Sequence, residues 1–381
     1  RLKLAARCPE TVTVRVFGSP VYSLYCNGTR LGRGSELHDA RQTFCEKYHL
    51  ALHSGDNWLH IQLWNPGVAA RPWYRMDHVS LLAVWPEKIS DRSRIATGCA
   101  PWEVRELPGF TQIADHPGRL AGPRVCRDGR LMAWDCMAPD AANYRPAELY
   151  FDSAIGELAH YDRVLPMMAE ALLETPATVR LADHPRPDRE AATALGAAFP
   201  DRALEFRAAR FMADGKPLTF TPHSFSRIVF DLNDYFCLYF RLMLSGGRNA
   251  IVTVSFAEAF FREPVSDPYS GCKDDRSRVD GLFHYGSGDR FIADGGEREF
   301  EPLDWNAGRY LILLVQTGDE ALTMTRLELF QTGYPLAITG DFQLTGGDGD
   351  KLAELSRRCR RTLRCCMHEL YLDCPYYERL M

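Results

Sequence analysis

The residues best suited to chemistry lie together near the end of the chain, in the run HELYLDCPYYERL at positions 368–380. This run places two acids, Asp373 and Glu378, around a proline and three tyrosines. Cleavage of a glycosidic bond needs such paired carboxylates, because one acid must stay protonated to donate to the leaving oxygen while aromatic walls hold the sugar. On spacing alone, an ordinary loop with two solvated acids is the stronger interpretation. Both interpretations therefore stay open at this level.

Other catalytic and ligand-binding motifs are missing from the sequence. Phe291 stands where the dinucleotide fingerprint that Gly286 could begin requires a glycine, and Leu372 stands where a zinc-protease helix requires its second histidine. No G-x-S-x-G nucleophile elbow occurs. The twelve cysteines include no C-x-x-C pair. The sequence therefore predicts neither a cofactor nor a metal site.

Composition and charge exclude several classes of protein. The 381 residues carry 45 Lys and Arg against 50 Asp and Glu, a formal net charge of −5, which argues against a strongly basic nucleic-acid binder. The longest apolar run falls far short of the ~20 residues of a membrane helix. We expect no nucleic-acid or membrane partner, while a homo-oligomer stays open. No signal-peptide core follows Arg1, and mostly free, buried thiols are expected, so a cytoplasmic location is favoured.

Outside the acidic run, strand patterns dominate the chain. Val12, Val14 and Val16 alternate with polar residues, and Asn27-Gly28 is a strong hairpin signal. Together these patterns predict a mainly β protein with two antiparallel, jelly-roll-like β-sandwich domains. The expected divisions are an N-terminal sandwich at 1–190, a linker at 191–216, a second sandwich at 217–338, and a helical start at 339–381.

The last division begins with an amphipathic helix. Leucines and cysteines recur at steps of three and four residues, which predicts a helix over 351–370. Its apolar face carries Leu352, Leu355, Leu363 and Leu370. Burying four leucines is worth ~6–12 kcal/mol, so we expect this face to be covered by neighbouring helices, by the second sandwich or by another copy.

Several segments resemble one known family. The run at 362–378, TL-x-x-C-x-HELY-x-DCPYYE, is similar to the opening of the catalytic-domain signature of bacterial α-L-rhamnosidases. Looser similarities to that family occur at 23–30 (SLYCNGTR), 55–63 (GDNWLHIQL), 228–232 (IVFDL) and 304–315 (DWNAGRYLILLV). The first of these resembles the family's ancillary domain, which implies that the sandwich at 1–190 is of the carbohydrate-binding type.

The resemblance implies a fold, an activity and a role for each acid. Glu378 matches the family's general acid, and Asp373 matches a carboxylate that holds the rhamnose hydroxyls. The family has an (α/α)6 barrel behind β-sandwich domains and inverts at the anomeric carbon, so a second carboxylate must activate water about 6.5–9.5 Å away. The expected partner is a rhamnose-containing glycan or glycoside. Arg379 stands where the family commonly has Gln.

The resemblance also leads us to expect that the chain is an N-terminal fragment, ending in the first helix of a truncated barrel. The general base would then be absent, and the chain alone would be inactive. A non-catalytic carbohydrate-binding or scaffold module is the alternative function, in which the sandwiches bind sugar and Glu378 is incidental.

Overall fold

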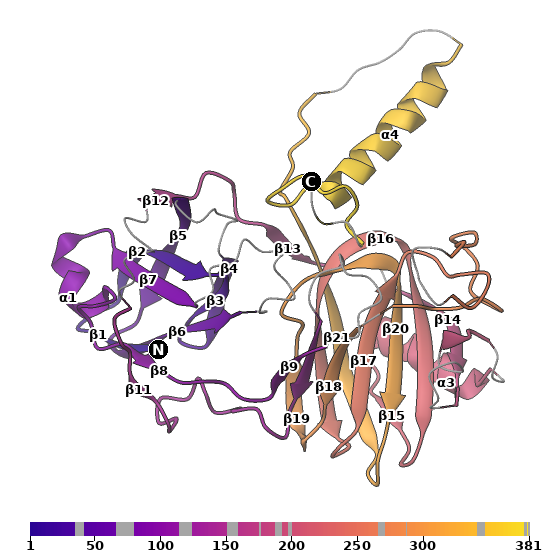
Figure 1. Ribbon diagram of the computed structural model, residues 1–381, viewed down its shortest axis with the longest axis horizontal. Coiled ribbons are helices and arrows are strands. Elements are labelled where there is room, and N and C mark those ends of the chain that lie inside the picture. Colours follow the sequence, from indigo (N-terminus) through magenta and orange to yellow (C-terminus); the bar gives the residue numbers. More distant parts are fainter. Residues whose placement is uncertain are drawn as a thin grey trace. The chain divides into compact units, whose positions relative to one another are not determined.

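The computed structural model describes residues 1–34, 42–65, 80–113, 124–150, 159–174, 177–186, 193–196, 200–265, 271–286, 288–340, 347–376 and 379. The chain is mainly β, as its sequence patterns predict (Figure 1). It divides into two compact units, Arg1–Pro108 with Ala133–Pro166 and Gly109–Met132 with Met167–Met381. The chain therefore passes between the units three times, whereas the sequence suggested one boundary near the segment 191–216.

The first unit contains two four-stranded sheets. One has the order β1 (Leu2–Ala6), β6 (Gly55–Trp64), β3 (Val21–Cys26) and β4 (Thr29–Gly34). The other has the order β12 (Ala159–Asp162), β5 (Gln42–Leu52), β2 (Glu10–Ser19) and β7 (Leu81–Pro86), with β12 parallel to β5. The shorter elements are η2 (Ile89–Asp91), α1 (Arg92–Ile95) and the pair β8 (Glu103–Val104) and β11 (Arg145–Pro146).

The buried faces of these two sheets form one core. Val12, Val14 and Val16 of β2 are buried, as their alternation predicts, and they cluster with Leu4 and Leu24 of the other sheet. Two sheets that share a core in this way make a β-sandwich.

The hairpin between β3 and β4 is also where the sequence places it. Asn27 and Gly28 both have positive φ, 49° and 79°, and Cys26 pairs with Thr29 across the turn. Positive φ at both central residues is the mark of a type I′ turn, which Asn-Gly adopts at little cost. The predicted hairpin is confirmed.

The second unit is organised by β16 (Phe225–Gly246), a strand of 22 residues. Its first part pairs with β20 and its last part with β21, and the register shifts between Asp231 and Phe236, where Asn233 has a φ of 64°. The first layer has the order β14 (Thr178–Asp183), β16, β20 (Asn306–Gln316), β17 (Ile251–Ala257), β18 (Gly288–Ile292), β10 (Val125–Asp128) and β9 (Phe110–Gln112). The second layer has β19 (Gly295–Phe300), β16 and β21 (Leu322–Gly333), with β13 (Ala169–Leu172) and β15 (Leu218–Phe220) on β21.

Aromatic rings join the two layers. Phe240, from the last part of β16, lies with its ring centroid 6.2 Å from that of Phe256 and 5.8 Å from that of Phe291. Phe256 and Phe291 belong to β17 and β18 of the facing layer. The second unit is therefore also a sandwich. Most of its strand pairs are antiparallel, and β10 pairs with β18 in parallel.

The segment 191–216, expected to be a linker, contains the helix α3 (Arg202–Asp214). Asp201 caps its first turn by accepting hydrogen bonds from the amides of Ala203 and Leu204, and Gly215 ends it in the left-handed conformation. Leu204, Ala208 and Phe211 are buried, and α3 packs against β14. The Pro- and Arg-rich composition nearby obscured this apolar stripe, so the linker expectation needs correction here.

The structure also corrects the expected extent of the first sandwich. Strands β13 and β14 lie within 1–190, yet β13 pairs with β21 and β14 pairs with β16, so both belong to the second unit. A strand's own sequence shows that it will pair but does not show with which neighbour, since many strands present compatible apolar faces.

The predicted C-terminal helix exists as α4 (Gly349–Cys366). It ends four residues before Leu370 because the backbone at Met367 is extended. Leu352, Leu355 and Leu363 are 39%, 55% and 39% exposed, so the second sandwich does not cover this face.

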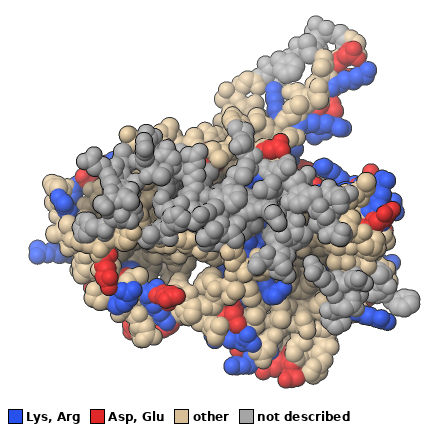
Figure 2. Space-filling view, viewed as in Figure 1, with Lys and Arg blue, Asp and Glu red and all other residues tan. Residues whose placement is uncertain are grey.

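Charged side chains of both signs gather along α4 (Figure 2). Arg357 and Arg358 both donate to Glu354, and these hydrogen bonds lower the pKa of Glu354 to about 2. Arg361 pairs with Asp234 of the sandwich. Arg357, Arg358 and Arg361 thus engage neighbouring acids in the way expected of a solvated helix face.

The buried His284 should make the stability of the second unit depend on pH. The residue is buried, and its Nε2 lies 3.1 Å from Ser255 Oγ. Burial, aided by the positive charge of Arg227, lowers the pKa of His284 to about 4. The neutral ring therefore contributes stability that is complete above pH 6.5 and is lost as the pH falls towards 4, because the unfolded chain takes up the proton first. We expect this histidine alone to cost about 2–3 kcal/mol at pH 4.5.

The measurement is urea unfolding between pH 7.5 and 4.5 of the wild type and of His284→Gln. The variant should lose less stability than the wild type over that range. Equal losses would show that His284 does not titrate differently in the folded state.

Candidate functional site

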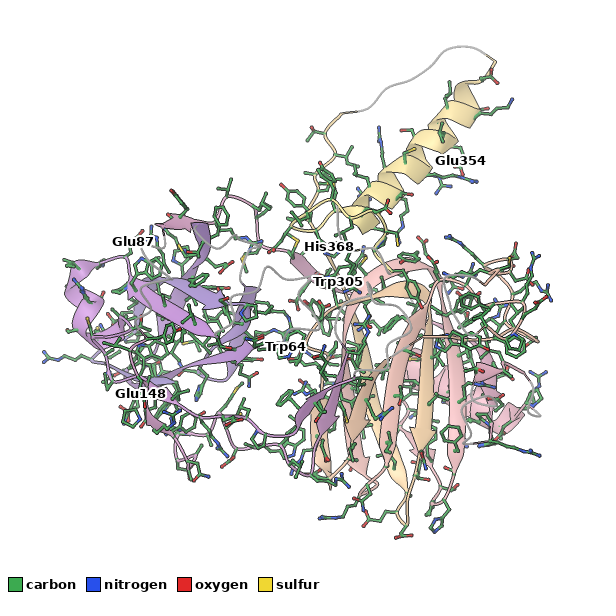
Figure 3. The ribbon with its side chains drawn as sticks, in the orientation of Figure 1. Trp64, Glu87, Glu148, Trp305, Glu354 and His368 are labelled. Atoms are coloured by element: carbon green, nitrogen blue, oxygen red, sulfur yellow. The ribbon has the colours of Figure 1, made fainter. Side chains whose placement is uncertain are left out.

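The acidic run predicted to carry the chemistry lies directly after α4. Figure 3 shows His368, at the start of this run, beside Trp305 of the second unit. Asp373 is exposed on the turn that follows, and Glu378 lies outside the described residues. The structure therefore places one of the two predicted acids at the surface and leaves the relation between the two open.

Backbone hydrogen bonds fold the run back on the end of α4. The amide of Leu372 donates to the carbonyl of Cys366 at 2.8 Å, and the amide of His368 donates to the carbonyl of Leu370 at 3.1 Å. The amide of Tyr334, just after β21, donates to the carbonyl of Met367 at 2.9 Å. The turn that presents Asp373 is thus tied both to α4 and to the sandwich.

Trp305 holds both ends of this run. The ring of His368 stacks on Trp305 with centroids 4.1 Å apart and planes 4° apart, while the guanidinium carbon of Arg379 lies 3.6 Å from the centroid of Trp305. Two groups at such distances from one centroid must occupy opposite faces, because on one face they would overlap. A desolvated cation–π contact of this kind is worth about 2 kcal/mol.

Arg379 is fixed by polar contacts as well. It donates from Nη1 to Asp304 Oδ2 at 2.9 Å, from Nη2 to the carbonyl of Trp305 at 3.0 Å, and from Nε to that of Pro375 at 3.1 Å. Asp304 uses its other oxygen to accept the amide of Trp305 at 2.9 Å. Both side chains of the pair are over nine-tenths buried. A buried charge pair with these extra hydrogen bonds has its desolvation offset and fixes one geometry.

Tyr376 enters the sandwich between these contacts. Its hydroxyl donates to the carbonyl of Phe256 at 2.9 Å, and Lys273 Nζ lies 5.2 Å from its ring centroid. Burial and then the charge of Glu258 raise the pKa of the Tyr376 phenol well above its ordinary range. Of the three tyrosines expected to flank a sugar, Tyr376 instead anchors the run, Tyr371 is exposed, and Tyr377 lies outside the described residues.

Two polar atoms at this junction are buried without a hydrogen-bond partner among the described residues: Tyr235 Oη and His368 Nε2. Burial, with the nearby charge of Arg379, lowers the pKa of His368 to about 3. The imidazole that stacks on Trp305 is therefore neutral near pH 7, which avoids two cations on one indole ring.

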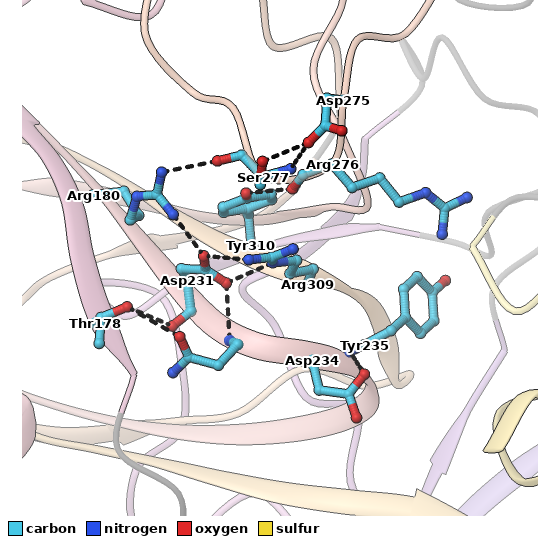
Figure 4. Close-up of polar contacts among 11 residues, drawn as sticks. Thr178, Arg180, Asp231, Asp234, Tyr235, Asp275, Arg276, Ser277, Arg309 and Tyr310 are labelled. Atoms are coloured by element: carbon cyan, nitrogen blue, oxygen red, sulfur yellow. Dashed lines mark hydrogen bonds and ion pairs between the residues drawn. The ribbon is translucent and has the colours of Figure 1, made fainter. Parts of the chain in front are cut away.

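A second polar cluster fixes the bend of β16. Asp231 accepts two hydrogen bonds from Arg309, at 2.8 and 2.9 Å, and a third from Arg180 at 3.1 Å (Figure 4). Burial opposes ionisation of Asp231, yet the hydrogen bonds from Arg309 and from the amide of Asn233 lower its pKa overall. The cluster joins β14, β16 and β20 just before the bend, and its carboxylate is fully occupied by structural partners.

Over the described ranges, no group of His, Cys, Asp and Glu could hold a metal ion. Nor is any described helix long and apolar enough to cross a membrane. All twelve cysteines are free, as expected, but only Cys26, Cys45, Cys237 and Cys365 are buried.

The sequence missed the residues that hold the acidic run. Asp304 and Trp305 were noted only as part of a resembling segment, and Arg379 only as a departure from the family's Gln. An aromatic residue beside an acid, just before a strongly apolar strand, is the one signal that could have suggested an anchoring role. The sequence could not have named the partner, because Arg379 lies more than 70 residues from Asp304 in the chain.

Comparison with known proteins was made by sequence and by structure. No family model matches the sequence, and no curated protein matches it. In structure the chain is similar to the GH78 family rhamnosidase of Bacillus sp. GL1, with a TM-score of 0.71 and 14% identity over 98% of this chain and 57% of that chain.

Two further rhamnosidase structures match nearly the whole chain. The α-L-rhamnosidase of Aspergillus terreus gives a TM-score of 0.57 and 14% identity, covering 99% of this chain and 38% of that chain. The α-L-rhamnosidase of Streptomyces avermitilis complexed with L-rhamnose gives a TM-score of 0.55 and 17% identity, covering 99% of this chain and 32% of that chain. The chain thus spans little more than half of the first of these proteins and about a third of the others. In fold, this chain corresponds across nearly its whole length to a portion of the GH78 α-L-rhamnosidases.

Proposed function

We propose that this chain is part of an α-L-rhamnosidase-like glycoside hydrolase and that it carries the general acid, Glu378, and a sugar-binding carboxylate, Asp373. The supporting observation is the DCPYYE run, which follows in the chain a sandwich whose fold is similar to that of the rhamnosidases. The substrate class would be terminal α-L-rhamnosides. Because the chain spans 57% of the Bacillus protein, the activity of the complete protein is part of the proposal.

In this mechanism, Glu378 donates its proton to the glycosidic oxygen as the bond to the anomeric carbon breaks. Inversion needs a second carboxylate, about 6.5–9.5 Å away, that takes a proton from the attacking water. We propose that this base comes from a part of the complete protein outside these 381 residues. Asp373 accepts hydrogen bonds from sugar hydroxyls, and its exposed position after α4 suits that role.

The experiment that tests the proposal is Asp373→Asn in the complete protein. A hydrogen bond from a sugar hydroxyl to a charged acceptor contributes about 1.5–3 kcal/mol, so we expect L-rhamnose to bind about 10- to 100-fold more weakly. Hydrolysis of an aryl α-L-rhamnoside should fall at least as much, because the hydroxyl contacts tighten in the transition state. Calorimetry and initial rates measure the two effects.

Asp319→Asn is the matched control, since Asp319 is an exposed aspartate in the turn before β21. It should leave both quantities unchanged. Unchanged binding and turnover in Asp373→Asn would remove Asp373 from the site. A complete protein that binds rhamnosides without hydrolysing them would favour the non-catalytic sugar-binding module.

A further inference from the structure

We infer that Asp304 and Trp305 of the second sandwich are positioning residues for the acidic run, acting as a clasp that closes on His368 and Arg379. The inference rests on the proposed function in that the run is taken to carry the general acid. It assigns a catalytic purpose to a β-domain that would otherwise serve only as a neighbour of the catalytic domain.

The first observation is that one indole ring holds both ends of the run. His368 and Arg379 are 4.1 and 3.6 Å from the centroid of Trp305, on its two faces. Two residues of the run, one at its start and one near its end, are therefore fixed on a single side chain. Asp373 lies between them in the chain, and Arg379 follows Glu378 directly.

The second observation is that the backbone of Trp305 is held by hydrogen bonds on both its amide and its carbonyl. Asp304 accepts the amide of Trp305 with one oxygen and Arg379 Nη1 with the other, each at 2.9 Å. Arg379 in turn donates to the carbonyl of Trp305 at 3.0 Å. Asp304, Trp305 and Arg379 thus constrain one another through both backbone and side chain, directly before the rigid strand β20.

The third observation is a further attachment of the run between His368 and Arg379. The hydroxyl of Tyr376 donates to the carbonyl of Phe256 at 2.9 Å. The apolar face of α4 is in contrast largely exposed. The run is therefore attached to the sandwich at three residues, His368, Tyr376 and Arg379.

A general acid works only when its proton lies within hydrogen-bonding distance of the leaving oxygen, and a misplacement of about 1 Å can cost about 10²-fold in rate. Because the run is attached at His368, Tyr376 and Arg379, Asp373 between the first two has little freedom to move. The clasp accordingly acts on turnover through the position of the run, without touching the substrate.

The test has two arms, and the first uses the 381-residue chain. Trp305→Leu keeps apolar volume but removes both stacking contacts, whereas Trp305→Phe restores an aromatic ring. Hydrogen–deuterium exchange is followed at the amides of His368 and Leu372, which donate to the carbonyls of Leu370 and Cys366. We expect exchange there to rise at least about tenfold in Trp305→Leu, with Trp305→Phe close to wild type.

Phe330→Leu is the matched control, because Phe330 lies under Arg241 in a similar cation–π contact on β21 of the same sandwich. It should leave exchange in the run unchanged. Asp304→Asn, which keeps the shape and weakens the ion pair, serves as the second variant if Trp305→Leu does not fold. Unchanged exchange in the run, or an equal rise throughout the second unit, would overturn the clasp.

The second arm measures kcat and KM for an aryl α-L-rhamnoside with the complete protein. In Trp305→Leu we expect kcat to fall about 10²-fold with KM within a few-fold of wild type, and Trp305→Phe to recover most of the rate. Faster exchange with normal kcat would overturn the positioning role. A wild-type protein without rhamnosidase activity would overturn the proposed function, and the exchange experiment would still decide whether the clasp exists.

Discussion

Glu378→Gln should lower the hydrolysis of a rhamnoside with a poor leaving group by about 10²–10⁴-fold in the complete protein, while leaving sugar binding largely intact. The change keeps the shape of the side chain and removes the proton that must reach the leaving oxygen. Cleavage of the glycosidic bond depends most on that proton when the leaving group is a basic alkoxide. The measurement is kcat on an alkyl rhamnoside, together with the Kd for L-rhamnose.

An activated aryl leaving group provides the internal control for this prediction. It needs little protonation, so it should partly restore the rate of Glu378→Gln but not that of Asp373→Asn, whose loss concerns the sugar itself. Glu263→Gln, at an exposed glutamate of the second unit, controls for the substitution. If Glu378→Gln kept a near-normal rate on the alkyl substrate, Glu378 would not be the acid.

Asp183→Ala should destabilise the second unit by about 3–5 kcal/mol. Asp183 and Arg227 face each other on β14 and β16, and their side chains are 0% and 1% exposed. Arg227 donates from Nε to Asp183 Oδ1 at 2.9 Å and from Nη2 to the other oxygen. Removing the carboxylate leaves a buried guanidinium without its counter-charge, which costs far more than a surface pair does. Urea unfolding measures the loss.

Asp214→Ala tests the same chemistry at the surface. Asp214 pairs with Arg210 one turn earlier on α3, and both side chains are about half exposed. Its loss should cost no more than about 0.5 kcal/mol, because water and salt screen such a pair. Similar effects in the two variants would mean that the Asp183–Arg227 pair is not desolvated in solution.

Local sequence patterns predicted the elements of this fold well. The alternation of Val12, Val14 and Val16 and the Asn27-Gly28 turn depend on backbone geometry within a few residues, so they can be recognised without knowing the rest of the structure. The helix of 349–366 was predicted for the same reason, although its end was not. Where the helix ends, the carbonyl of Met367 accepts a hydrogen bond from the amide of Tyr334, a contact that no helical periodicity contains.

The sequence by itself determined many of the strands outside 116–215, where the acids lie along the chain, and that the acidic run follows a helix. Tertiary structure alone decided that β13 and β14 belong to the second unit and that Tyr376 anchors the run instead of lining a sugar site. It also decided that Trp305 lies between His368 and Arg379. Turns and periodicities are encoded by neighbouring residues. The partner of a buried charge or ring depends on which distant strands fold next to it, and only the assembled sandwich specifies that.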